Sequence, residues 1–190
     1  LRLMLAKALQ LAAAGNSSVV WPDISTGTSV RSDAINCTDD VVGIFFKPDG
    51  TKIYTCEVND NIIETTLSTP WDISTHGSAD HTLTTDQTNH ADPRGLWFSP
   101  DGDEMYSVDA TGDVVVQYSL TTAWDLSTAS YTRKFDVSTE EANPKSVCFS
   151  SDGLNMYVTG YSGDGIDRYT LTTAWDISTA SHTSFSGSTT

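Results

Sequence analysis

The sequence predicts an all-β chain made of β-propeller blades, each a sheet of four antiparallel strands, and three observations carry this prediction. A unit of about fifty residues recurs, with Gly50, Gly102 and Gly153 at equivalent positions. Each copy contains four short extended runs that are separated by turn residues. Each copy also carries glycine and aromatic residues at fixed positions, which is typical of a propeller blade.

The repeats divide the chain into full and partial blades. Full blades are predicted at 41–92, 93–143 and 144–190, after a leading partial blade at 17–40. The partial blade contains Trp-Pro-Asp-Ile-Ser-Thr at residues 21–26, a damaged copy of the Trp-Asp-Ile-Ser-Thr element of the full copies. The chain is therefore expected to enter in the middle of a repeat.

Residues 1–16 are predicted to form a short N-terminal amphipathic helix that acts as an anchor. At about 100° per residue, the apolar side chains of this segment fall on one face, and Gly15 and Asn16 follow as a stop signal. These side chains are Leu1, Met4, Leu5, Ala8, Leu9, Leu11 and Ala12. No stretch of the sequence approaches the roughly twenty apolar residues of a membrane-spanning helix.

The first strand of each blade is predicted to be the innermost one. Its residues are almost all apolar (44–46, 96–98 and 147–149), and a short apolar run indicates burial on both faces. An Asp-Gly pair follows each run and predicts a hairpin turn, because glycine reaches positive φ at little cost.

The later strands of the blade are expected to be less buried. In the third strand, Val114, Val116 and Tyr118 alternate with other residues, which predicts that only one face packs. The fourth strand is rich in Thr and Ser and is expected to lie half exposed at the outer edge. It is predicted near residues 81–84, 131–135 and 182–185.

Charge and cysteine usage limit the functional classes. The formal net charge is −15, with 10 Lys and Arg against 25 Asp and Glu, and such a surface repels the phosphates of nucleic acid. Cys37, Cys56 and Cys148 are far apart and form no metal-binding or redox motif, so free and partly buried thiols are expected. The histidines are equally scattered and none is predicted to be catalytic. They are His76, His81, His90 and His182.

The Trp-Asp pair that recurs in every blade is interpreted as structural. Trp71, Trp124 and Trp175 could stack against a ligand, but a residue repeated in register favours packing between blades. The aspartates that follow could be catalytic, but capping of the next backbone N–H groups is favoured. They are Asp72, Asp125 and Asp176.

One end of the blades is predicted to be acidic. The turns between strands two and three should emerge on the same side as the connections between blades, opposite the Asp-Gly and Trp-Asp loops. Clustered carboxylates there could bind Ca²⁺, although no calcium-binding motif is present and a solvated acidic face explains them equally well. Whether these residues bind a metal ion is therefore unknown from the sequence, and no metal ligand is assigned. The residues are Asp39, Asp40, Asp60, Asp86, Asp92, Asp109, Asp113, Glu140, Glu141 and Asp164.

The number of blades raises a question of closure. Closed propellers typically have about four to eight blades, and an unclosed ring leaves sheet faces uncovered at its two ends. Two explanations are open. The chain is part of a longer one with further blades, or it is a homo-oligomer whose protomers together complete a ring.

The repeat resembles the YVTN-type β-propeller repeats. The segments that carry this resemblance are Phe-Ser-Pro-Asp-Gly at 98–102, Met105 with Tyr106, and the stretch 115–128, which ends in Thr-Thr-Ala-Trp-Asp-Leu-Ser-Thr. More narrowly, the blades are similar to the Trp-Asp-Ile-Ser-Thr repeats of bacteriophage virion proteins, often from marine phages. The resemblance covers roughly residues 20–186 and transfers no catalytic residue.

This resemblance implies a non-enzymatic structural or binding module. The expected role is a component exposed on the virion surface, such as a tail fibre, head fibre, decoration or host-attachment protein. Residues 1–16 would dock it on neighbouring virion proteins, and a host-surface ligand is a further implied partner. The alternative is a secreted bacterial adhesion or surface-layer propeller located at the cell surface.

A lactonase-like propeller enzyme is the third reading. The inner strands begin with Val42-Gly43, Arg94-Gly95 and Lys145-Ser146, and no histidine recurs at that level. The sequence also lacks a GxSxG elbow, a phosphate loop and a paired-acid motif. No catalytic residue, cofactor-binding residue or cofactor is therefore assigned.

Overall fold

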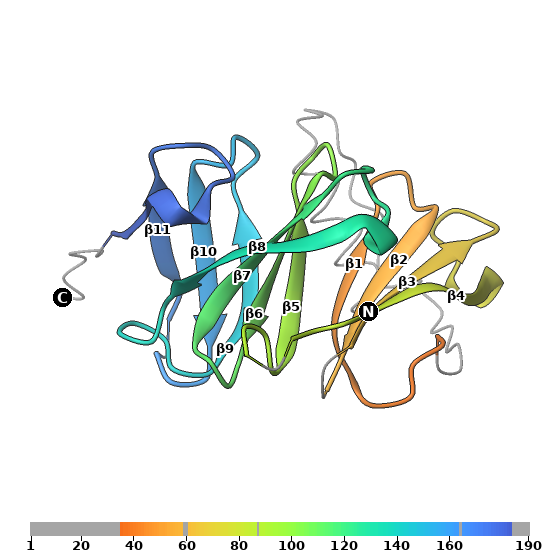
Figure 1. Cartoon of the computed structure of the whole chain (residues 1–190), viewed down its shortest axis with the longest axis horizontal. Helices are drawn as coiled ribbons and strands as arrows, with labels where there is room; N and C mark the ends of the chain where they lie inside the picture. The colour runs from red at the N-terminus through yellow and green to blue at the C-terminus, as the bar shows by residue number, and fades with distance from the viewer. Residues whose placement is uncertain (1–34, 59–60, 87, 164, 184–190) are drawn as a thin grey trace, which may run out of the picture.

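The computed structural model describes residues 35–58, 61–86, 88–163 and 165–183, which form three successive antiparallel sheets (Figure 1). Blade 1 contains β1 (Val41–Phe46), β2 (Lys52–Glu57), β3 (Asn61–Leu67) and β4 (His76–Thr84). Blade 2 contains β5 (Pro93–Phe98), β6 (Glu104–Asp109), β7 (Val114–Leu120) and β8 (Ala129–Asp136). Blade 3 contains β9 (Pro144–Phe149), β10 (Asn155–Gly160), β11 (Asp167–Leu171) and β12 (Ala180–His182). The helix predicted at 1–16 and residues 17–34 of the partial blade lie outside the described residues.

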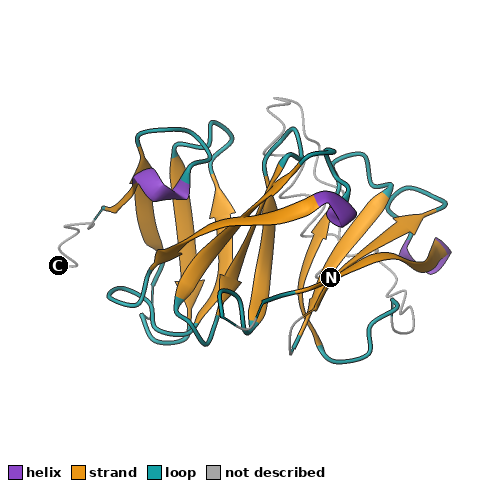
Figure 2. Ribbon diagram, viewed as in Figure 1, coloured by secondary structure: helices purple, strands orange, loops and turns teal. Residues whose placement is uncertain are grey.

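The strands of each blade follow one another in space as they do in sequence, and the first strand is the inner one. Strand β5 contacts both β1 and β9, so the inner strands of the three blades lie side by side (Figures 1 and 2). The predicted inner position of the apolar first strand is therefore confirmed. All pairings within the blades are antiparallel, as short turns between consecutive strands require.

The Asp-Gly turn and the Trp-Asp loop of each blade form one structural unit. In blade 2, Gly102 has φ of 80°, and a Cβ added there would lie 2.1 Å from Cε2 of Trp124. The backbone N–H of Trp124 donates to the carbonyl of Gly102 at 3.0 Å, and Trp124 itself has φ of 65°. Glycine is therefore required at this position twice, for its positive φ and for the ring that covers it. The other two blades repeat this arrangement.

A short 3₁₀ helix follows the tryptophan in each blade, and the adjacent aspartate caps it. The three helices are η2 (Ile73–Thr75), η3 (Leu126–Thr128) and η4 (Ile177–Thr179). In η3, the carboxylate of Asp125 accepts from the backbone N–H of Ser127 at 3.0 Å. The repeated aspartates thus act as N-caps, which is a structural role.

Neighbouring blades are joined by a recurring set of hydrogen bonds, which we call the latch. The hydroxyl of Tyr54 in blade 1 donates to the carbonyl of Trp124 in blade 2 at 2.7 Å. The hydroxyl of Tyr106 in blade 2 donates to the carbonyl of Trp175 in blade 3 at 2.5 Å. Each latch therefore ends on the backbone of the loop that holds the repeated tryptophan.

A residue of the third strand completes each latch. The carboxylate of Glu64 in β3 accepts from the backbone N–H of Leu126 at 2.6 Å. At the equivalent position of β7, the amide of Gln117 donates to the carbonyl of Trp175 at 3.1 Å and accepts from the N–H of Ile177 at 3.4 Å. Both side chains are almost fully buried, so these bonds satisfy groups that water cannot reach.

The hydrophobic core lies between the blades rather than on one side of them. One cluster joins blades 1 and 2 and contains Val116, whereas a second joins blades 2 and 3 and contains Val115. The prediction that the third strand packs on one face only is therefore wrong, because a blade is covered on both faces by its neighbours. The fourth strands are half exposed as predicted, although β4 begins at His76 rather than near residue 81, and β8 and β12 begin at Ala129 and Ala180 rather than near residues 131 and 182.

The three cysteines are free thiols, as predicted. Cys56 is buried, and Cys37 and Cys148 are half-buried. Burial raises the pKa of Cys56 and Cys148, which keeps both thiols protonated at neutral pH.

The latch gives a direct test of the contact between blades. We expect Tyr106→Phe to lower the free energy of unfolding by about 1 kcal/mol, because one buried hydrogen bond is lost while Gln117 still donates to the same carbonyl. Urea denaturation would measure the change. Tyr161→Phe is the control, since Tyr161 is 81% exposed, and an equal effect of both substitutions would contradict the latch.

Candidate functional site

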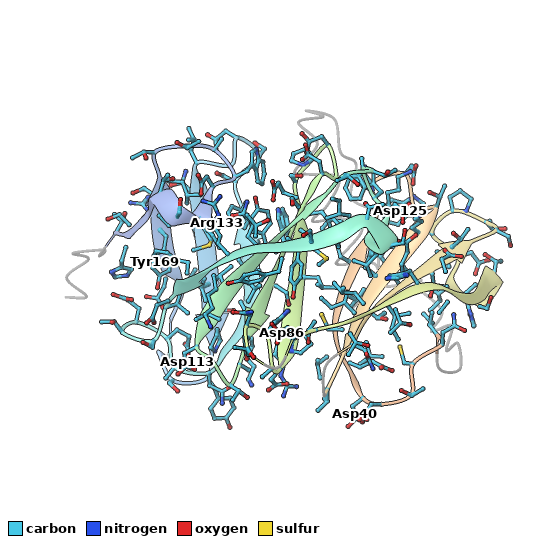
Figure 3. All side chains as sticks on the ribbon, in the orientation of Figure 1. Asp40, Asp86, Asp113, Asp125, Arg133 and Tyr169 are labelled. Carbon is cyan, nitrogen blue, oxygen red and sulfur yellow. The ribbon has the colours of Figure 1, made fainter. Side chains whose placement is uncertain are left out.

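Many of the acidic residues singled out by the sequence lie at one end of the blades, which we call the lower rim. Asp40, Asp86 and Asp113 lie at this end and Asp125 at the other (Figure 3). The described part of the lower rim comprises residues 38–40, 85–86, 88–92, 110–113, 137–143 and 161–163. The predicted acidic end is therefore present. Asp60 and Asp164 lie outside the described residues.

Two cations lie at the start of the inner strands, at the lower rim. Arg94 is the second residue of β5 and Lys145 is the second residue of β9, and the equivalent residue of β1 is Val42. Both side chains are half-buried. They stand out because the whole chain has only 10 Lys and Arg.

Close approach of the inner strands brings these cations near one another. A Cβ added at Gly43 would lie 2.0 Å from the carbonyl oxygen of Arg94, and one added at Gly95 would lie 2.7 Å from Cα of Ser146. Only residues without a large side chain allow such contact between backbones. Arg94 and Lys145 are therefore held on adjacent strands at the same height.

The environment of the pair combines charge and burial. The guanidinium of Arg94 forms an ion pair with Asp92, with Nη2 and Oδ2 2.7 Å apart. Burial, and then the positive charge of Arg94, lower the pKa of Lys145, whereas Asp92 and Glu141 act in the opposite direction. Lowering the pKa of a lysine increases the fraction of neutral amine at any given pH, and the neutral amine is the form that can accept a proton.

A buried carboxylate organises the lower rim in each blade. Glu57 at the end of β2 accepts from the N–H of Asp39 at 3.1 Å, and Asp109 at the end of β6 accepts from the N–H groups of Ala91 and Thr111 at 2.8 and 2.9 Å. Both residues are nearly inaccessible to water. Each carboxylate therefore replaces water as the acceptor for backbone donors of the loops.

Blade 3 supplies the same carboxylate from a different position. Gly160 ends β10 where Glu57 and Asp109 end the equivalent strands, and a Cβ added there would lie 2.5 Å from the carboxyl carbon of Glu141. Glu141 is fully buried and accepts from the N–H groups of Ser162 and Gly163 at 2.8 and 2.9 Å. The glycine thus makes room for a carboxylate that comes from the connection between blades.

His90 is a buried polar residue that the sequence did not single out. Its Nδ1 lies 3.0 Å from the hydroxyl of Tyr118, and the side chain is fully buried. Burial raises the pKa of Tyr118, so its hydroxyl stays protonated and can donate to the imidazole. The polar residues around His90 in the sequence gave no sign of this burial. His76, His81 and His182 are exposed or half-buried, as scattered loop and edge residues would be.

The acidic residues of the lower rim are used mainly as acceptors. Asp113 accepts from the N–H of Asn143 at 2.7 Å, and Asp86 accepts from the N–H of Thr88 at 2.9 Å. Glu140 lies 3.6 Å from His182 and accepts from the hydroxyl of Tyr169 at 3.3 Å. Within the described ranges, no three His, Cys, Asp or Glu side chains come together in a group that could hold a metal ion.

A separate cavity of about 180 Å³ lies at the opposite end of the inner strands. Its walls include Phe45, Trp97, Trp124 and Trp175, together with serines that follow β5 and β9. The described lining contains no titratable group. This cavity therefore offers mainly apolar contact to a ligand.

Comparisons with known proteins identify the fold. No family model and no curated protein matches the sequence. Among solved structures, the chain is similar to a candidate 6-phosphogluconolactonase from Bacteroides uniformis, with a TM-score of 0.55 and 19% identity over 75% of this chain and 39% of that one. It is also similar to the periplasmic gluconolactonase PpgL of Pseudomonas aeruginosa, with a TM-score of 0.54 and 17% identity over 75% and 39% of the two chains. A protein from Lactobacillus plantarum gives a TM-score of 0.56 and 15% identity over 76% and 40%.

These findings correct two predictions. The chain was expected to be a non-enzymatic component of a phage virion, but the similar structures include lactonase-like propellers and none that supports a virion role. The prediction that the chain is not an enzyme is contradicted by the same likeness. The chain spans about two fifths of the length of these structures, and at this identity the likeness establishes a propeller-like fold. In the described part of the chain, no helix is long and apolar enough to cross a membrane.

The role of the Glu141 carboxylate in blade 3 can be tested by moving a carboxylate from position 141 to position 160. We expect Glu141→Ala to lower the free energy of unfolding by about 2 kcal/mol, because two backbone N–H groups lose their acceptor. Gly160→Asp alone should also destabilise the fold, since its Cβ would overlap Glu141. The double variant should recover part of the loss, but not all of it, because the carbonyl oxygen of Asn143 also lies 2.6 Å from that Cβ. Additive losses in a double-mutant cycle would contradict this exchange.

Asp109 predicts a pH dependence of stability. Burial alone would raise its pKa, but the N–H groups of Ala91, Gly112 and Thr111 outweigh burial and hold the pKa below the ordinary value of 3.8. The unfolded chain therefore takes up the proton first as the pH falls, and the stabilisation is lost between 3.8 and the lower folded pKa. We expect Asp109→Asn to cost about 2 kcal/mol at pH 7 and progressively less below pH 4, as measured by urea denaturation. A difference that does not change with pH would contradict this origin.

Proposed function

We propose that these three blades are part of a lactonase-like propeller hydrolase, built from YVTN-type repeats, whose substrate is an anionic sugar lactone. The observation that carries the proposal is the pairing of Arg94 and Lys145 at the start of the inner strands, in a chain with a formal net charge of −15. An acidic surface repels anions, so two adjacent half-buried cations mark the place where an anion would bind. The likeness to lactonases supports this reading.

The proposed reaction is hydrolysis of the ring ester. Water adds to the carbonyl carbon, the bond from that carbon to the ring oxygen breaks, and a carboxylic acid and a hydroxyl group form. The carboxylic acid then releases its proton to the solvent and becomes a carboxylate. Neutral Lys145 would take a proton from the attacking water and return it to the departing ring oxygen. Arg94 would donate hydrogen bonds to an anionic oxygen of the substrate, which stabilises the negative charge where it is bound or develops.

Each role matches the environment of its residue. A base needs a pKa near the working pH, and burial together with Arg94 lowers the pKa of Lys145 in that direction. Arginine keeps its charge at any accessible pH, and Asp92 fixes its orientation through the ion pair. A phosphorylated lactone suits the site better than a neutral one, because Arg94 keeps its charge and can interact with the phosphate while neutral Lys145 acts as the base.

A location outside the cytoplasm is part of the proposal. One of the similar lactonases is periplasmic, and the acidic composition of this chain suits such a setting.

The proposal is tested by measuring the hydrolysis of 6-phosphogluconolactone and of gluconolactone, with the release of acid as the readout. We expect the phosphorylated lactone to be the better substrate and kcat/KM to rise with pH as Lys145 loses its proton. Arg94→Gln and Lys145→Met should each lower kcat/KM roughly 10- to 100-fold, the loss expected for one hydrogen bond to a charged group. Only Lys145→Met should also remove the rise with pH.

Lys134→Met is the matched control for these variants. Lys134 lies on the outer strand β8, where its ammonium donates to the carbonyl of Thr88 at 3.3 Å. The substitution Lys134→Met removes the same charge from the chain as Lys145→Met does, and it leaves the inner strands unchanged. Equal rates for all three variants, or no hydrolysis of either lactone by the wild-type chain, would overturn the proposal.

A further inference from the structure

The cavity at the end of the blades opposite the lower rim is bounded by all three blades. Its volume is about 180 Å³, and every blade contributes to its described lining. We call this end the upper rim, and Asp125 marks it in Figure 3. Pro48, Pro100 and Ser151 line the cavity and are exposed. Because each of them precedes an Asp-Gly pair, the mouth of the cavity opens between the Asp-Gly turns of the three blades.

The wall of the cavity is rich in aromatic rings. Five of its ten described lining residues are aromatic, namely Phe45, Trp97, Phe98, Trp124 and Trp175. The three tryptophans are only half-buried, so each remains partly accessible. The face of an aromatic ring carries partial negative charge and attracts a cation, most strongly in tryptophan. The wall therefore suits a ligand that is both apolar and positively charged.

Two serines of the lining connect the cavity to carboxylates. The hydroxyl of Ser150 donates to the carboxylate of Asp152 at 2.5 Å. The hydroxyl of Ser99 donates to the carboxylate of Asp103 at 3.2 Å. Both carboxylates thus lie one hydrogen bond away from residues that line the cavity. At such short range, their charge acts on any ligand inside it.

Basic side chains do not neutralise these two carboxylates. In the part of the chain that the structure describes, neither Asp103 nor Asp152 forms an ion pair. Lys47 is the basic residue of the turn in blade 1, and its ammonium lies 2.8 Å from the carboxylate of Asp49. The hydrogen bond from Ser150 lowers the pKa of Asp152, so this carboxyl group is ionised at neutral pH. The potential at the mouth of the cavity is therefore negative.

We propose that this cavity binds an organic cation through a trimethylammonium group. Such a group has no N–H that needs an acceptor, and its methyl groups spread the charge over an apolar surface. The lining suits this chemistry, because it combines aromatic rings with few polar groups. A metal ion would instead need several oxygen ligands, and an anion would be repelled by the carboxylates.

The size and position of the cavity agree with such a ligand. A cavity of about 150 Å³ accommodates benzene, so about 180 Å³ is sufficient for a trimethylammonium group. The cavity lies at the end opposite Arg94 and Lys145. Binding of the cation is therefore independent of the proposed hydrolysis.

The test compares two ligands of the same shape by isothermal titration of the full 190-residue chain at low ionic strength. One is choline, and the other is the neutral alcohol in which a tert-butyl group replaces the trimethylammonium group. We expect choline to bind at least roughly tenfold more tightly, because only its charge interacts with the rings and the carboxylates. Equal affinities, tighter binding of the alcohol, or no binding of choline would overturn the proposal.

Variants of the wall and of the mouth locate the binding site. We expect Trp97→Leu to weaken the binding of choline roughly tenfold or more, with circular dichroism as the check that the variant is folded. Asp152→Asn should weaken it about two- to threefold, because one nearby charge is removed. This second variant tests the site even if Trp97→Leu does not fold.

Asp86→Asn is the matched control for Asp152→Asn. Asp86 accepts from the N–H of Thr88 at 2.9 Å, just as Asp152 accepts from the N–H of Leu154 at 3.0 Å, but Asp86 lies at the lower rim. Both substitutions remove one negative charge from the chain, and only Asp152→Asn should change the affinity for choline. An equal loss in both variants, or unchanged binding by a folded Trp97→Leu chain, would place the cation elsewhere and overturn the proposal.

Discussion

Each blade depends on the contact between a tryptophan ring and the backbone of a glycine. Gly50, Gly102 and Gly153 combine positive φ with the absence of a side chain, and the ring of a later loop occupies the space that a Cβ would need. The tryptophans are themselves held at positive φ, which is costly for a bulky residue, so the ring contact must offset that cost. The contact fixes the turn after the first strand to the loop after the third. It also directs the tryptophan carbonyl toward the preceding blade, where the tyrosine hydroxyl of the latch meets it.

The lower rim obeys a different constraint, which is that its backbone N–H groups must find acceptors. Glu57 and Asp109 meet this need from the end of the second strand, whereas Glu141 meets it from the connection before β9. The position of the carboxylate is thus preserved although the residue that supplies it differs. Arg94 and Lys145 lie beside these loops at the start of the inner strands. Gly43 and Gly95 let the inner strands approach closely, which places the two cations on adjacent strands. The proposed chemistry therefore depends on features that first serve the fold.

The sequence predicts the local features well, because turns and caps depend on neighbouring residues. The repeat, the Asp-Gly turns, the inner apolar strand and the half-exposed outer strand could all be read from it. It does not predict which side chains meet across blades. The proximity of Arg94 to Lys145, the burial of His90 and the placement of Glu141 against Gly160 each depend on distances between segments far apart in the chain. The predicted function was wrong for a related reason. The repeated residues determine the architecture of the blades and give no information about which residues meet at the lower rim.

The latch has one further property, which concerns how such a chain can change over time. On the receiving side, its bonds end on main-chain atoms, namely the carbonyl of the tryptophan and the N–H two residues later. The preceding blade contributes side chains to the latch. Its tyrosine is the same in both joints, whereas the residue of its third strand is Glu64 in blade 1 and Gln117 in blade 2. Any blade that keeps the loop conformation can therefore follow any blade that keeps the tyrosine. Duplication or loss of a whole unit leaves the joints intact, and the number of blades becomes free to vary by recombination.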